Sequence, residues 1–467
     1  MTLDDRISAL VLQASRRLSD ACDSGEVPGA ALAVAAGGTT VLEAAFGLAS
    51  VEDGVAATVD TPFSLASVTK PMVGTALAVL AERGALDLDA QVSRYRPLPG
   101  HGTAPTLRQV ANHTGGFPTF LRFFYGDEID RAPSKNDLLR AYARVVFPPG
   151  VRQTYSNVGY ELLGAIIEEV TGSPLADALS ELVFEPLEMR SARFGEPDGG
   201  PGAARRHTSS GSAYPPYVTG HGAAAEAWCS VRDLLRFGLA HAGGMSALPA
   251  EALAASHRPT APWPGADGYG IGWGVRRHGD LSIAFHGGSM GGVAAYLVAV
   301  PTAGIVIAAL ANVQSGRELL ISVTNDILAA LLPGFTPLTR ADGSPDGELL
   351  SAPAAEVGGE WSGSLDLPSG AVPLFLSIAP DGSGTARWDS TDHAITKLRV
   401  TDSSVTVELD GLADAPDLAA RPHAPALWLH RTAATELAGG LAAIGVQNAD
   451  HPLQPDIVVW PASLRLA

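Results

Sequence analysis

The first 50 residues carry two different hydrophobic patterns. Apolar residues recur every three or four positions, which predicts one amphipathic helix: Ile7, Leu10, Val11, Ala14, Leu18 and Ala21. Apolar and small residues then dominate the runs on either side of Gly37-Gly38 in VPGAALAVAAGGTTVLEAAFG. Because paired glycines readily adopt the positive φ angles of tight hairpin turns, this stretch predicts two antiparallel strands.

Three further stretches have the helical period of apolar residues. They run from Met72 to Glu82, from Val158 to Thr171 and from about Arg317 to Leu332. The second stretch is followed by Gly172, a typical C-terminal stop for a helix. Its apolar face is continuous: Leu162, Leu163, Ile166, Ile167 and Val170.

Alternation of apolar and polar residues predicts strands in much of the remaining chain. One antiparallel sheet is predicted from YGIGWGVRR, LSIAF, His286-Gly287-Gly288-Ser289, VAAYLVAV and IVIAALAN. Residues 336–352 have the composition of a linker, which divides the chain into domains at 1–335 and 353–467. The second domain is predicted to be a small all-β barrel, closed or nearly closed, from WSGSLDL, VPLFLSIAPDGSGTARW, AITKLRV, SVTVELD, APALWLH and DIVVW.

Composition narrows the class of protein. A chain of 467 residues suits two or three domains, and its formal net charge of −18 argues against nucleic acid or an anionic membrane as a partner. The sequence has no apolar run of about 18 residues that would predict a membrane span. The N-terminus carries acidic residues and no continuous apolar core, so we expect a cytoplasmic protein without a secretory signal. Cys22 and Cys229 have no metal-binding spacing and fit two free thiols or one long-range disulfide.

Ser67 and Lys70 are the strongest candidates for chemistry. A helix that begins at Ser67 would place both side chains on one face, one turn apart. The chain has three lysines, and only Lys70 has a serine three residues earlier. A buried lysine can lose its proton and then activate a serine, which arginine cannot do. The pattern alone also fits a serine helix cap followed by a lysine that reaches the surface.

Two later motifs supply further candidates. Tyr155 and Asn157 lie in a turn that leads into the Val158–Thr171 helix, which is a rigid support for catalytic side chains. They also fit a turn tyrosine with an asparagine cap. His286-Gly287-Gly288 lies on one of the predicted strands.

Two other residues are interpreted as non-catalytic. Ser289 lies in a Gly-Gly-Ser-Met-Gly stretch that matches the G-x-S-x-G motif of α/β-hydrolases. That motif needs a helix after the turn, whereas Val293–Val300 predicts a strand. His113 lies in a Thr-Gly-Gly turn and is interpreted as a structural hydrogen-bonding residue.

In chain order, Ser67-x-x-Lys70, Tyr155-x-Asn157 and His286-Gly287-Gly288 resemble the S-x-x-K, Y-x-N and K/H/W-x-G motifs of the serine β-lactamase and penicillin-binding-protein superfamily. The resemblance is to the branch of class C β-lactamases, DD-peptidases and family VIII esterases, and it covers roughly residues 1–335. Surrounding stretches agree: FSLASVTKP, ANHTGGF, YSNVGYELLGAIIEEVTG, YGIGWG and FHGGSMGG. It implies an α/β (α+β) β-lactamase-like transpeptidase fold, an antiparallel sheet flanked by helices plus an all-helical subdomain. The C-terminal β domain looks lipocalin-like, and similar domains are appended to proteins of this superfamily.

The resemblance implies roles for four of these side chains. Ser67 would attack a carbonyl group and form an acyl-enzyme. Lys70 and Tyr155 would share the proton transfers, and either could be the general base. Asn157 would hold Lys70 or the substrate amide.

The strand motif is expected to bind substrate. The backbone N–H groups of Ser67 and Ser289 would bind the oxyanion, and Gly287 and Gly288 would let the strand approach closely. His286 stands where class C β-lactamases carry lysine. A largely neutral imidazole binds the carboxylate of a β-lactam less well than a permanent cation does.

These inferences predict a cytoplasmic serine hydrolase that cleaves an ester or amide, rather than an antibiotic-resistance enzyme. Its expected substrate is a small-molecule or peptidyl acyl compound, with a carrier-tethered thioester as a further candidate. One alternative is an acyltransferase or peptide cyclase/thioesterase of natural-product biosynthesis, which passes the same acyl group to an amine or alcohol. Another is a catalytically dead ligand-binding homologue. We expect no cofactor, metal, nucleic-acid or membrane partner.

Overall fold

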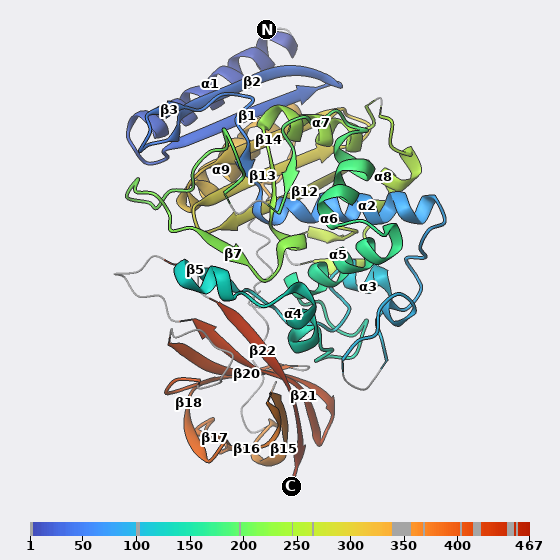
Figure 1. The fold of residues 1–467 in the computed structure, drawn as a ribbon, viewed down its shortest axis with the longest axis vertical. Coiled ribbons are helices and arrows are strands. Elements are labelled where there is room, and N and C mark those ends of the chain that lie inside the picture. The colour runs from blue at the N-terminus through green and yellow to red at the C-terminus, as the bar shows by residue number, and fades with distance from the viewer. Residues whose placement is uncertain are drawn as a thin grey trace. The chain divides into compact units, whose positions relative to one another are not determined.

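The computed structural model describes residues 3–99, 103–195, 198–244, 246–263, 266–338, 356–367, 369–401, 404–413, 422–445, 453 and 456–467 (Figure 1). The chain divides into two compact units. The first comprises Met1–Ala90, Phe124–Asp130 and Leu163–Asp342, and the second comprises Gln91–Phe123, Arg131–Leu162 and Gly343–Ala467. From residue 339 on, the predicted linker at 336–352 lies outside the described residues.

An antiparallel sheet forms the centre of the first unit. Among the described residues it has nine strands, in the order β3-β2-β1-β14-β13-β12-β11-β10-β9. The bounds are β1 Gly29–Ala36, β2 Thr39–Ser50, β3 Val55–Ala56, β9 Ala261–Trp263, β10 Ala266–Tyr269, β11 Gly274–His278, β12 Leu281–Met290, β13 Val293–Val300 and β14 Ile305–Ala311. The predicted first hairpin is confirmed, because Gly37 and Gly38 have φ angles of 59° and 76° between β1 and β2.

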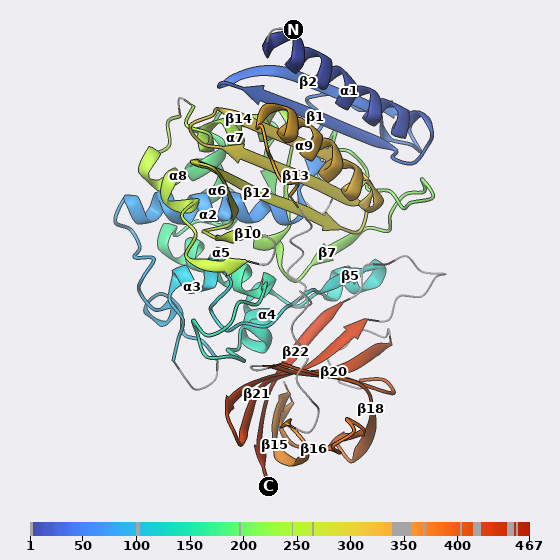
Figure 2. The same cartoon turned by 180° about the vertical axis from the view of Figure 1, so that it is seen from behind.

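Helices cover both faces of this sheet. α1 (Leu3–Asp23) and α9 (Arg317–Leu331) pack together on one face, which Figure 2 shows in front. α7 (Val231–His241) packs on the opposite face, with α2 (Thr69–Glu82) and α8 (Ala250–Ser256) on that side. The α1 stripe is buried as predicted at Val11, Ala14, Leu18 and Ala21, whereas the side chain of Ile7 lies outside the described part. Among the described helices, none is long and apolar enough to cross a membrane.

Further helices and strands lie outside the central sheet and the helices that cover it. The helices are α3 Leu107–Ala111, α4 Lys135–Tyr142, α5 Asn157–Thr171 and α6 Leu175–Leu179. The strands are β4 Phe63–Ser64, β5 Phe123–Tyr125, β6 Arg193–Phe194, β7 Tyr217–Thr219 and β8 Ala227–Cys229. β8 pairs with both β4 and β6. Both cysteines are free, which confirms the thiol alternative.

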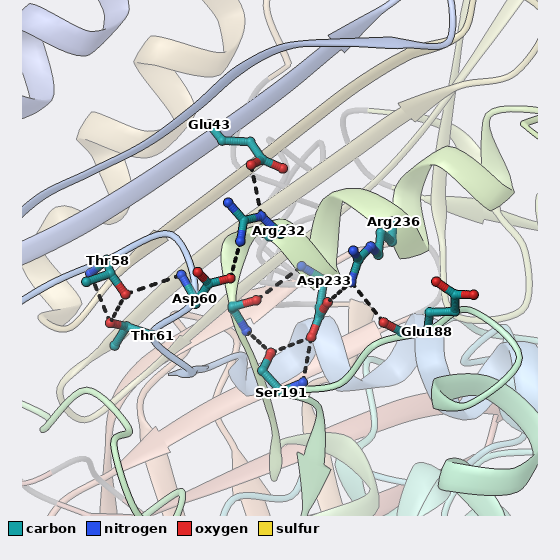
Figure 3. A network of polar contacts seen from close by, with 10 residues as sticks. Glu43, Thr58, Asp60, Thr61, Glu188, Ser191, Arg232, Asp233 and Arg236 are labelled. Carbon is teal, nitrogen blue, oxygen red and sulfur yellow. Dashed lines mark hydrogen bonds and ion pairs between the residues drawn. The ribbon is translucent and has the colours of Figure 1, made fainter.

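A polar network at the start of α7 joins segments that are distant in the sequence (Figure 3). Arg232 donates from Nε to Glu43 on β2 over 2.9 Å and also pairs with Asp60. The carboxylate of Asp233 accepts a hydrogen bond from the backbone N–H of Ser191 over 2.7 Å. Through Asp60, the network connects the segment that leads into β4 to the start of α7.

One predicted strand is wrong. YGIGWGVRR was expected to be continuous, but β10 ends at Tyr269 and β11 begins at Gly274. Between them, Gly272 has a φ of 84°, and a Cβ there would lie 2.5 Å from the carbonyl oxygen of Lys70. A Cβ on Gly74 of α2 would lie 2.4 Å from the carbonyl oxygen of Ile271. The glycines thus let this bend lie directly against the backbone of α2.

The C-terminal residues form the predicted closed barrel. Its eight strands, counted over the described residues, are β15 Gly359–Leu367, β16 Gly370–Ile378, β17 Gly384–Trp388, β18 Thr391–Val400, β19 Ser404–Leu409, β20 His423–Ala433, β21 Glu436–Gly445 and β22 Ile457–Leu466. β21 was not predicted, because its sequence contains alanines and the pair Gly439-Gly440. A Cβ on Gly439 would lie 2.0 Å from the carbonyl oxygen of Trp428, so close strand packing explains that glycine.

Candidate active site

Ser67 lies in a short turn between β4 and α2. The turn is a single 3₁₀ segment, Ala66–Val68, and α2 begins at Thr69, so the helix starts two residues later than predicted. Ala66 has a φ of 45°, an uncommon conformation for a residue with a Cβ. The hydroxyl of Thr69 donates to the carbonyl oxygen of Ala66 over 2.7 Å and supports this turn. Ser67 caps neither helix, and its side chain is half-buried.

Lys70 is fully buried beneath this turn, which contradicts the alternative of a lysine that reaches the surface. Its Nζ atom lies 3.1 Å from Oγ of Ser67 and 3.1 Å from the carbonyl oxygen of Ala224. Burial disfavours the charged form and lowers the pKa of Lys70 well below its usual value. A neutral amine has two N–H donors and one lone pair. With one N–H directed to Ala224, the lone pair can accept the hydroxyl proton of Ser67.

His286 lies on β12 and is held as a neutral imidazole. Its Nδ1 atom lies 2.8 Å from the carbonyl oxygen of Gly287, and a carbonyl can only accept, so Nδ1 carries the proton. Nε2 then accepts from the hydroxyl of Tyr269 over 3.0 Å. Burial, followed by repulsion from Lys70 when that amine is protonated, lowers the pKa of His286 to about 3. The expectation of a neutral imidazole at this position therefore agrees with its surroundings.

β12 packs against the Ser67 turn at Gly288. A Cβ on this residue would lie 2.1 Å from the carbonyl oxygen of Leu65, so a larger residue would separate the strand from the turn. Ser289 follows on the same strand and is half-buried. Its strand leads directly into β13, not into a helix, which agrees with rejecting Ser289 as an α/β-hydrolase nucleophile.

Tyr155 and Asn157 lie in the second unit, whereas Ser67, Lys70 and His286 lie in the first. Asn157 is the first residue of α5, and its Nδ2 donates to the carbonyl oxygen of Phe120 over 2.8 Å. The joining of the two groups in one site stays a prediction from the sequence.

His113 supports the turn that carries Tyr155. Its ring lies 4.5 Å from the Tyr155 ring, and its Nδ1 accepts the backbone N–H of Ser156 over 3.2 Å. The carbonyl oxygen of His113 also accepts the N–H of Thr154 over 2.8 Å. These contacts agree with the interpretation of His113 as a structural residue.

The sequence did not indicate three of the groups that contact these candidates. The carbonyl oxygens of Ala224 and Phe120 belong to residues whose side chains carry no chemical signal. Tyr269 was visible in the YGIGWG stretch, but the motif gives no reason to pair it with His286.

A pair of neutral, buried histidines, His241 and His257, packs against α2. Nε2 of His257 is 2.8 Å from Nδ1 of His241, and Nε2 of His241 is 3.0 Å from the hydroxyl of Thr75. Because that hydroxyl donates to the carbonyl oxygen of Pro71, the proton donors run in one direction from His257 to Pro71. Burial lowers the pKa of His257 to about 4 and that of His241 well below its usual value.

We expect this pair to make the protein sensitive to mild acid. Below about pH 6.5 the unfolded chain binds protons that the folded histidines exclude, so stability falls as the pH is lowered toward 4 and is unaffected above 6.5. Each such histidine gives a slope of about 1.4 kcal/mol per pH unit. Urea unfolding followed by tryptophan fluorescence should show a shallower slope between pH 6.5 and 5 for His257→Asn than for the wild type. His278→Asn, on the half-exposed end of β11, is the matched control. Equal slopes for all three proteins would contradict the expectation.

Comparison with known proteins covers both parts of the chain. The family model described as Beta-lactamase matches residues 14–330. Esterase EstB of Burkholderia gladioli is 38% identical over 184 residues, which are 36% of this chain and 47% of the esterase. The matched region therefore spans about half the length of that relative.

Two of the similar solved structures match over different lengths of the chain. The alignment with the structure of SurE covers 99% of this chain and 99% of the SurE chain, with 25% identity and a TM-score of 0.64. SurE has also been solved with D-Leu. A class C beta lactamase from Rhodobacter sphaeroides covers 68% of this chain and 99% of its own, with 26% identity and a TM-score of 0.58. The first similarity includes the barrel.

Proposed function

This chain belongs to the beta-lactamase family, and from that premise we propose that it is a serine hydrolase that forms an acyl-enzyme at Ser67 and cleaves an ester or amide. The single observation that carries the proposal is the buried amine of Lys70, 3.1 Å from the hydroxyl of Ser67. A serine needs an adjacent base to become a nucleophile, and a lysine with a lowered pKa can supply one.

The first half-reaction follows from this pair. The lone pair of Lys70 accepts the proton of Ser67 while Oγ bonds to the carbonyl carbon of the substrate. The negative charge that develops on the carbonyl oxygen is bound by the backbone N–H groups of Ser67 and Ser289. When the tetrahedral intermediate collapses, the bond to the alcohol or amine breaks, and the leaving group takes the proton from the Lys70–Tyr155 pair. Water then repeats the sequence on the acyl-enzyme and restores Ser67.

His286 favours acyl groups without a carboxylate next to the reacting carbonyl. A neutral imidazole committed to Gly287 and Tyr269 offers no permanent positive charge to an anionic substrate. This supports an esterase or amidase in preference to an enzyme that destroys β-lactam antibiotics.

A second candidate function is acyl transfer, including cyclisation of a peptide. The observation that favours it is the similarity to SurE, which extends through the barrel to 99% of both chains. In this variant the amine or alcohol of an acceptor, in place of water, attacks the acyl-enzyme at the carbonyl carbon and loses its proton to Lys70. The bond from the carbonyl carbon to Oγ of Ser67 then breaks, and Oγ takes the proton back from Lys70. Since SurE has been solved with D-Leu, D-amino acyl compounds belong among the substrates to be tested.

Intact-mass spectrometry of the full-length protein tests the proposal and separates the two functions. The protein is mixed with p-nitrophenyl esters, D-amino acid amides, β-lactams and acyl thioesters, and adducts are mapped by peptide digestion. We expect an acyl group on Ser67 with at least one ester or amide, and its release as free acid. Addition of an amine should shift the product to an amide if the protein is a transferase. An adduct on another residue, or none with any compound, would contradict the acyl-enzyme proposal.

A further inference from the structure

A five-residue segment of the second unit holds the turn that contains Tyr155 and Asn157. We name this segment, Thr119–Phe123, the strap. The hydroxyl of Thr119 donates to the backbone carbonyl oxygen of Tyr155 over 3.1 Å. The carbonyl oxygen of Phe120 accepts from Nδ2 of Asn157 over 2.8 Å, and this bond is buried. Because only the nitrogen of the amide can donate to a carbonyl, the bond also fixes which end of the Asn157 amide points away from the strap.

The remaining three residues of the strap are held by the barrel. Leu121 and Ile457, the first residue of β22, exchange two backbone hydrogen bonds of 2.8 Å each. The backbone N–H of Phe123 donates to Oδ1 of Asp456 over 2.8 Å. Nη1 of Arg122 donates to Oδ2 of the same carboxylate over 2.8 Å. Every residue of the strap from 121 to 123 therefore contacts residue 456 or 457.

Asp456 is a buried carboxylate that anchors the strap. The side chains of Asp456 and Arg122 are 1% and 7% exposed, and Nε2 of His423 on β20 lies 3.8 Å from Oδ2. A buried carboxylate that pairs with an arginine and a backbone N–H is strongly restrained, because either partner left alone would carry an unpaired buried group. The anchor comes from more than 330 residues along the chain. No local property of the strap sequence can supply this restraint.

We propose that Asp456 is a positioning residue for the hydrolase reaction, and that the barrel sets the Tyr155–Asn157 turn through the strap. The proposal rests on the proposed function, because it takes Tyr155 and Asn157 to act on the acyl-enzyme. Asp456 fixes Arg122 and Phe123, Ile457 fixes Leu121, and the adjacent Thr119 and Phe120 hold the turn. The barrel is then a working part of the active site and not only an appended stabilising domain. A misplacement of about 1 Å in a catalytic group can slow a reaction about 10²-fold.

The test is a double replacement of the buried pair, Arg122→Met with Asp456→Leu, in the full-length chain. Apolar residues of similar volume often replace a buried ion pair without loss of stability, so folding and the restraint can be separated. The probe is a p-nitrophenyl ester at saturating concentration, and the measured quantity is the single-turnover rate constant for acylation. We expect that constant to fall about 10- to 100-fold with KM near its wild-type value, while the thermal midpoint falls modestly because the buried N–H of Phe123 loses its acceptor on Asp456. Lys397→Met with Glu408→Leu, an exposed pair on β18 and β19 at 3.5 Å, is the matched control and should leave acylation unchanged.

A double-mutant cycle with Tyr155→Phe distinguishes positioning from general stabilisation. If Asp456 acts through the turn, its replacement should slow acylation much less when the Tyr155 hydroxyl is already absent. Additive effects of the two changes would overturn the proposal, as would wild-type acylation in a folded Arg122→Met/Asp456→Leu protein. If that double variant does not fold, Arg122→Lys takes its place, because lysine keeps the charge but lacks the planar guanidinium group. Additive effects with Tyr155→Phe, or wild-type acylation, would again overturn the proposal.

The proposed function can fail separately. If Tyr155→Phe alone leaves acylation unchanged, the role of Tyr155 is wrong whatever the barrel variants do. If Tyr155→Phe slows acylation by about 10² to 10⁴, the usual range for general acid–base catalysis, but the barrel variants do not, the positioning proposal alone is wrong.

Discussion

Replacement of Ser67 by alanine is expected to abolish covalent labelling by a fluorophosphonate or penicillin-type probe and to lower ester turnover about 10⁴-fold or more. In the proposed mechanism the acyl group bonds to Oγ of Ser67. The general base and the oxyanion site would remain in the variant, but neither can form that bond. Lys70 would keep its hydrogen bond to Ala224, and the fold should be unchanged because the Ser67 side chain is half-buried and caps no helix. Gel fluorescence and intact mass measure the labelling.

The matched control for this experiment is Ser64→Ala. Ser64 lies on β4, three residues before the candidate nucleophile, and its buried hydroxyl makes no hydrogen bond to any residue that the structure describes. We expect Ser64→Ala to be labelled at the wild-type rate. Labelling that persists in Ser67→Ala but disappears in Ser289→Ala would instead place the nucleophile on β12.

The sequence was sufficient for the parts of the fold that local patterns determine. The stripe of α1, the Gly37-Gly38 turn and the closed barrel follow from hydrophobic periods and turn residues, and each is present. β21 was missed because its Gly439 serves close packing against Trp428, which is a tertiary requirement. The break after Tyr269 has the same cause, since Gly272 lies against the backbone of α2. In both places the glycine is required by close contact with a neighbouring element, which the local sequence does not show.

In the candidate site, too, local features could be predicted from the sequence and tertiary features could not. S-x-x-K spacing alone indicated that Ser67 and Lys70 would meet, because three residues along a helical turn bring side chains together. The depth of Lys70, and hence its lowered pKa, could not be predicted from the tetrapeptide. That depth depends on the segment around Ala224, which comes from more than 150 residues away. The strap and its anchor at Asp456 were equally invisible, because backbone carbonyls leave no pattern in a sequence.

Replacement of Lys70 by arginine is expected to slow acylation of Ser67 by about 10³-fold, within the range for loss of a general base. Arginine brings a permanent positive charge and several N–H donors, but it cannot release its proton inside a protein and so offers no lone pair to Ser67. Lys70→Met removes the amine without burying a charge and should be equally slow. Single-turnover acylation with a p-nitrophenyl ester measures both variants, and Lys397→Arg on the barrel, where the side chain is half exposed, is the matched control.

The pH dependence of the wild type supplies the second half of the Lys70 prediction. The amine acts as a base only when it is neutral, so acylation should be lost as the pH falls through the lowered pKa of Lys70 and should be constant above it. An unperturbed lysine would instead give a rate that rises until about pH 10.4. A Lys70→Arg protein that retains more than about a tenth of the wild-type rate would show that residue 70 acts through its charge, and the proton of Ser67 would then have to pass to Tyr155.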